Sequence, residues 1–234
     1  MDDGSIDNTP DLLASYAEQI IYIHQANRGV SAARNAGIRA SRGSLIAFLD
    51  SDDYWLPDKL AFQAAFFDAN RRASICQTEE IWVRNGVRVN PKKKHTKPSG
   101  EIFKRSLSLC LVSPSAVMLR RELFDDVGLF DETLPACEDY DMWLRISCRY
   151  PVHLIDKPLI IKKGGHPDQL SRQPGLDKYR IRSLLGLIKG GRLSNTQLSQ
   201  ATTILKEKCA IYAAGCRKHD KENEAVYYER LADL

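Results

Sequence analysis

Four adjacent residues in the first quarter of the chain place carboxylates directly after an apolar run. Asp50, Ser51, Asp52 and Asp53 follow the segment SLIAFL. Carboxylates this close repel one another unless a cation or hydrogen-bond donors compensate them. Mg²⁺ and Mn²⁺ prefer oxygen ligands and can bridge a carboxylate and a diphosphate, so a divalent ion is one natural compensator. Because Asp and Ser also cap helices, this motif alone leaves a metal site and a helix cap as equal alternatives.

Two further groups of acidic residues could take part in chemistry of a different kind. The sequence DDGS begins at Asp2, and Glu138 and Asp139 lie together in CEDYDMWLRI. By itself DDGS is typical of a turn. The acidic pair suits the start of a helix, where acids face the positive end of the dipole, but a carboxylate there can also accept a proton from an attacking hydroxyl. Between these groups, NRGVSAARNAG predicts a small-residue helix from which Arg34 reaches either a polar ligand or solvent.

The pattern around these residues predicts alternating strands and helices. The run at 44–49 is short enough for a strand buried on both faces, and it ends at Asp50. We expect further strands at Ile20–Ile23, Ile81–Val83, Val117–Leu119 and 151–162, and helices within Asn8–Tyr22 and over Val30–Ala40, Trp55–Asn70, Arg121–Val127 and Tyr140–Tyr150. Such alternation favours an α/β fold with a parallel sheet.

Two segments depart from this alternation. RVNPKKKHTKPSG, rich in Lys and Pro, predicts a mobile loop. From Asp177 onward the pattern is helical, over YRIRSLLGLIKGG, Asn195–His219 and Glu222–Leu234. We therefore expect one domain over residues 1–175 and a helical C-terminal extension of packed helices over residues 176–234.

Composition narrows the class of protein. The chain has 234 residues, of which 43% are hydrophobic, and a net charge of +4, which is slight for this length and argues against nucleic acid as a partner. Its six cysteines lack the close pairs typical of zinc or redox sites, which favours a reducing cytoplasm. No apolar run approaches the length of about 18 residues expected for a membrane span, and the first residues lack the pattern of a signal peptide.

The order of the motifs is more specific than any one of them. DDGSIDNT, NRGVSAARNAG, FLDSDDYWLPDKL and CEDYDMWLRI together resemble the inverting family 2 glycosyltransferases of GT-A fold, over about residues 2–172. The resemblance implies an α/β, Rossmann-like nucleotide-diphospho-sugar transferase fold with a mostly parallel sheet. It also implies transfer of a sugar from a nucleotide diphosphate sugar to an acceptor hydroxyl with inversion, as in glycan or polysaccharide assembly.

The resemblance assigns roles by position. Asp139 matches the catalytic base, with Glu138 beside it, and Asp52 matches a ligand of Mg²⁺ or Mn²⁺. At the place of His166 the family often has a histidine or basic residue in a flexible segment that closes over the donor diphosphate, so His166 is either a metal or phosphate contact or an exposed loop residue. Lys162, Lys163 and Arg172 flank it and either neutralise phosphate or are solvated. The implied donor-binding residues are Asp2, Asp3, Asn27, Arg34, Asp50 and Asp53.

The chain departs from the family at its first residue. Members usually begin with a strand, a turn and a helix before the DDGS turn, whereas this chain begins at the turn itself. We expect that the first β-α unit is absent, as in a fragment or a chain with an upstream start. Its loss should expose apolar strand edges and weaken donor binding.

The acceptor and two rival functions stay open at this point. A glycan, a lipid-linked molecule or a protein fits the acceptor role. The lysines Lys92–Lys94 have two interpretations: they contact an anionic membrane or a lipid-linked acceptor at the inner membrane face, or they belong to a solvated loop. One rival is a non-catalytic nucleotide- or carbohydrate-binding protein. The other is a nucleotidyltransferase, which should carry a glycine-rich phosphate loop that this sequence lacks.

Overall fold

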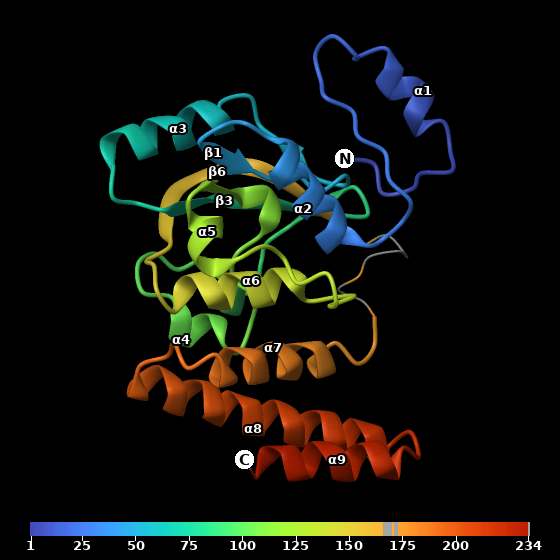
Figure 1. The fold of residues 1–234 in the computed structure, drawn as a ribbon, viewed down its shortest axis with the longest axis vertical. Coiled ribbons are helices and arrows are strands. Elements are labelled where there is room, and N and C mark those ends of the chain that lie inside the picture. The colour runs from blue at the N-terminus through green and yellow to red at the C-terminus, as the bar shows by residue number, and fades with distance from the viewer. Residues whose placement is uncertain (166–169, 171–172, 234) are drawn as a thin grey trace.

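The structure is a computed structural model that describes residues 1–165, 170 and 173–233 (Figure 1). Its regular elements are, in chain order, α1 (Thr9–Ala14), α2 (Val30–Ala40), β1 (Leu45–Ala47), β2 (Tyr54–Trp55), α3 (Lys59–Ala69), β3 (Ile75–Arg84), β4 (Val87–Val89), η1 (Lys93–His95), α4 (Phe103–Ser106), η2 (Pro114–Ala116), β5 (Val117–Arg120), α5 (Leu123–Val127), α6 (Glu138–Ser147), β6 (His153–Gly164), α7 (Asp177–Lys189), α8 (Asn195–Arg217) and α9 (Glu222–Ala232). Strands and helices are thus interspersed up to β6, and α7, α8 and α9 follow it.

The strands form one mixed sheet in the order β1-β5-β3-β6-β2, with β4 paired to β3. β3 and β6 are parallel, and β5 runs antiparallel to both β1 and β3. Consequently β1, β3 and β6 point in the same direction, and their carboxyl ends lie at one edge of the sheet. Polar residues that follow these three strands are thereby brought together.

The prediction of a mostly parallel sheet is wrong in strand direction, although the α/β class is confirmed. β5 inserts between the two like-directed strands β1 and β3, and β2 is antiparallel to β6. β4 returns along β3 through Asn85 and Gly86, which both have positive φ. An Asn-Gly pair with this conformation forms a two-residue hairpin, a local turn that forces antiparallel pairing.

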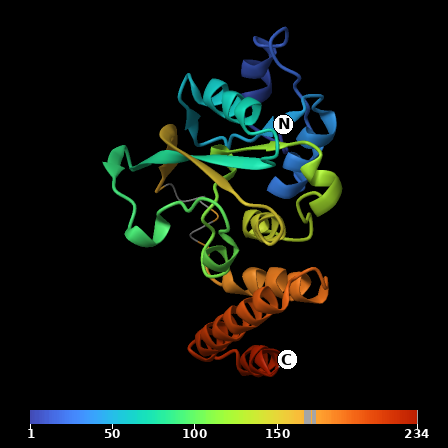
Figure 2. The same cartoon turned by 90° about the vertical axis from the view of Figure 1, so that its left-hand side faces the viewer.

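The sheet separates two apolar layers. On one face α3 packs through Phe67 against Cys76 and Met118. On the other face α5 and α6 cover the alternate residues of the same strands, with Met142 and Trp143 in the core. A third cluster joins α4 and α6 to α7 and α8, so that the C-terminal helices stack beyond α6 (Figures 1 and 2). α8 begins with a reciprocal capping box between Ser194 and Gln197.

Several predicted boundaries differ from the structure. Ile20–Ile23 do not form a strand; among the described residues this region contributes one bridge, between Asp2 and His24. Trp55 belongs to β2, and the helix predicted from it begins at Lys59. The predicted loop at 88–100 contains the end of β4 and a 3-10 turn, and it buries Lys97 and Pro98. Trp55 is in a strand because it pairs with β6, which is distant in the sequence, and no local pattern encodes such a partner.

The outer edge of β1 has no strand beside it in the described part of the chain, because β1 is the terminal strand of the sheet order. The absence of a preceding β-α unit, with the exposed apolar edges that it should leave, stays a prediction. No helix within the described residues is both long and apolar enough to cross a bilayer.

A buried ion pair fixes the segment after β4 to the sheet. Lys97 Nζ lies 3.0 Å from Glu80 Oε1, and the two side chains are only 6% and 3% exposed. Lys97 also donates to Gln77 Oε1, and Trp82 Nε1 donates to the other Glu80 oxygen. Burial acts to raise the pKa of Glu80, but the charges of Lys97 and Lys162 outweigh it and lower the pKa to about 2.

Removal of one partner should therefore cost more than removal of both charges. We expect Lys97→Met to lower the free energy of unfolding by about 3–5 kcal/mol, because it leaves Glu80 buried without its cation. The double variant Lys97→Met/Glu80→Gln should recover much of that loss. Urea unfolding at pH 7 measures both values. Equal losses in the single and double variants would show that the pair contributes packing alone.

Candidate functional site

One large cavity, of about 1470 Å³, lies at the carboxyl ends of β1, β3 and β6. The starts of α2 and α6 and the N-terminal turn form its other walls. It brings together nine of the ten residues that the sequence predicted for the site: Asp2, Asp3, Asn27, Arg34, Asp50, Asp52, Asp53, Glu138 and Asp139. The tenth, His166, lies outside the described residues, as does Arg172.

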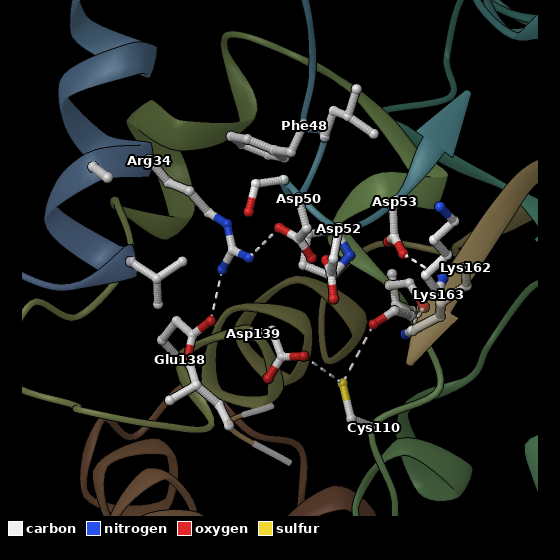
Figure 3. A pocket seen from close by; sticks show the side chains of 18 of the residues that line it. Arg34, Phe48, Asp50, Asp52, Asp53, Cys110, Glu138, Asp139, Lys162 and Lys163 are labelled. Carbon is white, nitrogen blue, oxygen red and sulfur yellow. Dashed lines mark hydrogen bonds and ion pairs between the residues drawn. The ribbon is translucent and has the colours of Figure 1, made fainter. Parts of the chain in front are cut away.

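Arg34 on α2 joins two acidic segments that are far apart in sequence (Figure 3). Its Nη2 donates to Asp50 Oδ1 and its Nη1 donates to Glu138 Oε1, each at 2.6 Å. The side chain is 11% exposed, and its guanidinium lies 5.3 Å from the ring centre of Phe130. Burial acts to lower the pKa of Arg34, but Asp50 and Glu138 raise it above its ordinary value. Arg34 thus holds protein carboxylates in place while it lines the cavity, and its contact with a ligand stays a prediction.

The turn after β1 divides its three carboxylates between different partners. Asp50 accepts from Arg34, and its own N–H donates to Ser115 Oγ at 3.0 Å. Asp53 is buried, and its Oδ1 accepts the N–H of Lys163 at 3.0 Å, which ties the turn to β6. Burial raises the pKa of Asp53 to about 6, despite hydrogen bonding from Ser115. Asp52 stands between them, half-buried and lining the cavity.

The acidic pair lies in the first turn of α6, as the sequence predicted. Cys137, in the left-handed conformation, precedes the helix and turns Glu138 and Asp139 toward the cavity. Burial and the charge of Asp139 raise the pKa of Glu138, whose carboxylate binds Arg34. Asp139 Oδ2 lies 3.5 Å from the Cys110 thiol, and burial raises the pKa of that thiol well above its usual range. Asp139 is the half-buried carboxylate of the pair and lines the cavity, and its Oδ1 accepts the N–H of Tyr140 at 2.6 Å.

Asp2 and Asp3 lie at the cavity rim with their carboxylates engaged by the protein. Asp2 accepts the N–H of Ser5 and the hydroxyl of Tyr22, and these hydrogen bonds hold its pKa well below its usual range. Asp3 accepts the backbone N–H groups of Arg28 and Gly29, at 3.0 and 2.8 Å, just before α2 begins.

The glycine of this turn is required by space and by conformation. Gly4 has φ of +89°, and a Cβ there would lie 2.8 Å from the backbone nitrogen of Asn27. A side chain at this position would therefore push Asn27 away from the turn. The segment before α2 therefore packs directly against the DDGS turn.

Lys162 lines the site, whereas sequence analysis named it only as a charge that flanks His166. β6 carries it into the cavity, where its Nζ donates to Ser113 Oγ at 3.0 Å. Burial acts to lower its pKa, but Glu80, Asp53 and Asp139 outweigh that effect and raise it. A strand register cannot be read from a Lys-Lys pair, which is why the sequence gave no signal for this cation among the acids.

Comparison with known proteins adds independent information to this geometry. The sequence profile of the family described as Glycosyl transferase family 2 matches residues 1–128, more than half of the chain. The chain belongs to glycosyltransferase family 2. Among relatives, a Rickettsia conorii protein named as an uncharacterized glycosyltransferase is 32% identical over 184 residues, which cover 74% of this chain and 30% of that protein. This family 2 chain therefore spans less than a third of that relative.

A second relative has a defined activity in its name. The Escherichia coli UDP-Glc:alpha-D-GlcNAc-diphosphoundecaprenol beta-1,3-glucosyltransferase WfaP is 30% identical over 152 residues, covering 62% of this family 2 chain and 56% of WfaP. The match thus covers little more than half of WfaP.

Solved structures show that the family 2 chain has the GT-A glycosyltransferase fold. Staphylococcus aureus TarS, residues 1–349 in complex with UDP-GlcNAc, matches with a TM-score of 0.69 at 20% identity, over 89% of this chain and 61% of TarS. The Pyrobaculum calidifontis mannosyltransferase PcManGT, in complex with GDP-Man and Mn²⁺, matches with a TM-score of 0.54 at 17% identity, over 100% of this chain and 69% of PcManGT. The predicted fold class is confirmed.

Loss of Arg34 should destabilise the family 2 domain far more than loss of an exposed arginine on the same helix. We expect Arg34→Met to cost about 3–5 kcal/mol of unfolding free energy, since Asp50 and Glu138 would lose their shared cation. Arg39→Met is the matched control, because Arg39 is 55% exposed in its pair with Glu132 and should contribute at most about 1 kcal/mol. Urea unfolding measures the free energy of unfolding of both variants. Similar losses of this free energy would mean that the Arg34 ion pairs do not stabilise the fold more than an exposed ion pair does.

Proposed function

We infer that this chain forms the catalytic core of an inverting glycosyltransferase that uses a nucleotide diphosphate sugar and a divalent metal ion. The observation that carries this proposal is the placement of Asp52 and Asp139 in one cavity, from the end of β1 and the start of α6 (Figure 3). Glu138 is held by Arg34, which leaves Asp139 as the carboxylate suited to meet an acceptor.

The proposed reaction is one direct displacement. The acceptor hydroxyl loses its proton to Asp139 as its oxygen forms a bond to the anomeric carbon. The bond from that carbon to the diphosphate oxygen breaks, and its electron pair leaves with the nucleoside diphosphate. Attack from the face opposite to the leaving group inverts the anomeric centre. Lys162, which lies among the carboxylates of Asp53 and Glu80, supplies a fixed positive charge near the leaving group.

The residues present fit a metal ion that is completed by its substrate. Within the described residues no three His, Cys, Asp or Glu side chains converge to enclose a metal. Mg²⁺ commonly binds through one or two carboxylates plus substrate phosphates, so an enclosing cage is not required. Asp52 would hold the ion, with Asp50 and Asp53 anchoring the turn on both sides. When bound, the ion would neutralise charge that develops on the diphosphate.

Donor binding is proposed for the rim formed by the DDGS turn and α2. The nucleotide would lie along Asp3, Asn27 and Asp50, with Asp2 and Arg34 holding these segments from behind. UDP-Glc in the name of WfaP and UDP-GlcNAc and GDP-Man in the complexes of TarS and PcManGT support a sugar nucleotide as donor. They do not agree on one nucleobase, so the donor test below uses two.

Nucleotide and metal should together stabilise the folded chain. With Mn²⁺ and UDP or GDP at about 100 times the dissociation constant, the expected gain is about 2.7 kcal/mol, seen as a rise in Tm. Asp52→Ala should abolish this gain, whereas Asp58→Ala, an exposed carboxylate in the following segment, should retain it. A rise of equal size in both variants would remove Asp52 from the metal site.

Asp139 should be required for transfer but not for donor binding. We expect Asp139→Asn to slow release of nucleoside diphosphate from the stabilising sugar nucleotide by about 10²- to 10⁴-fold. Its thermal stabilisation by nucleotide and Mn²⁺ should stay unchanged. Asp68→Asn, on the exposed side of α3, serves as the control for loss of one carboxylate. Nucleotide binding by the wild type without any turnover would favour a non-catalytic binding protein.

A further inference from the structure

The cavity has a second wall whose charge is opposite to that of the acidic turn. The carboxyl ends of β3 and β6 contribute Arg84, Lys162 and Lys163, and the segment after β4 contributes His95. Trp82 lies among them: its ring centre is 5.2 Å from that of His95, and the Arg84 guanidinium is 5.8 Å from it. Lys163 contacts Asp53 through its backbone, and Lys162 acts on Asp53 through its charge, whereas Arg84 and His95 have no role in the proposed donor site.

The positive charge of this wall is only partly compensated. Glu80 is the carboxylate within it, and Glu80 is already paired with Lys97 at 3.0 Å. Its second oxygen accepts from Trp82 Nε1 at 2.9 Å, which fixes the indole. Burial lowers the pKa of His95, and the cations Lys94, Arg84, Lys162 and Lys92 lower it further. Four cations thus act on this imidazole, which also contacts the ring of Trp82.

A smaller hollow extends the basic wall. It has a volume of about 390 Å³ and shares Leu109 and Leu111 with the main cavity. Its polar lining is Lys94, Arg105 and Ser108. Arg105 is positioned by donation from Nη2 to the carbonyl of Thr96 at 2.9 Å. We call this hollow and the adjoining His95 and Arg84 the basic recess.

We propose that the basic recess binds a phosphate or diphosphate group carried by the acceptor. The hollow and the main cavity share Leu109 and Leu111, which flank Cys110, and the Cys110 thiol lies 3.5 Å from Asp139 Oδ2. An acceptor whose phosphate binds Lys94 and Arg105 could therefore extend past this shared wall toward the proposed base. Cations in a recess of this kind recognise phosphate through charge-assisted hydrogen bonds. This inference rests on the proposed function in naming the acceptor, but the recess itself can be tested without turnover.

The test is titration calorimetry of the full chain with glucose 1-phosphate, with EDTA present so that metal-dependent donor binding is suppressed. Uncharged glucose is the comparison ligand, and inorganic pyrophosphate is a second probe. The wild type should bind both phosphate probes and not glucose. Whichever of the two probes binds more tightly then distinguishes a diphosphate from a phosphate monoester as the recognised group.

Two matched double variants locate the binding. Lys94→Gln/Arg105→Gln should weaken glucose 1-phosphate binding about tenfold or more, while Lys206→Gln/Lys218→Gln, which removes two exposed charges of the α8 segment, should bind as the wild type does. Equal affinity in both variants, or equal binding of glucose and its phosphate, would overturn the proposal.

A nucleotide competition separates this proposal from that of the donor site. UDP with Mn²⁺ should still raise the Tm of Lys94→Gln/Arg105→Gln, because these residues lie outside the donor rim. If UDP instead displaces glucose 1-phosphate from the wild type, the recess receives the donor diphosphate and the acceptor assignment is wrong. Phosphate binding that persists in a chain without nucleotide binding would sustain the recess and count against the proposed donor site.

Discussion

The double ion pair of Arg34 is the constraint on which the rest of the site depends. One nearly buried guanidinium on α2 holds Asp50, after β1, and Glu138, at the start of α6. A buried cation of this kind must be compensated, and the guanidinium divides its donors between the two carboxylates. The three segments therefore cannot move independently. The bridge engages the carboxylates of Asp50 and Glu138. Their sequence neighbours Asp52 and Asp139 line the same cavity (Figure 3).

Charge around the cavity is arranged by strand direction. β1 delivers acids to the edge where β3 and β6 deliver Arg84 and Lys162, because these three strands point the same way although only β3 and β6 are paired in parallel. Lys162 donates a hydrogen bond to Ser113. Burial acts to lower the pKa of Lys162, but the acidic residues Glu80, Asp53 and Asp139 raise it. An anionic ligand in this cavity would meet a compensated acidic end and a basic end within one space.

Local signals in the sequence predicted much of this arrangement, and non-local pairing accounts for what they missed. The bounds of α2 were predicted, the acidic turn follows a buried strand, and the C-terminal segments are helices, because periodicity and capping are encoded within a few residues. The direction of β5, the pairing of Trp55 in β2 and the position of Lys162 in β6 depend on partners far along the chain. The engagement of Asp2 by Tyr22 and of Asp3 by the backbone before α2 was likewise invisible to motif reading.

The open edge of β1 has a consequence for how this chain behaves at high concentration. Backbone donors and acceptors on that edge have no strand partner among the described residues, and the segment Leu45–Leu49 lacks the lysine or proline that commonly protects an edge. A second chain can add a strand there and continue the sheet between molecules. Residues 45–49 also line the main cavity. Intermolecular sheet formation and ligand entry would then compete for the same surface.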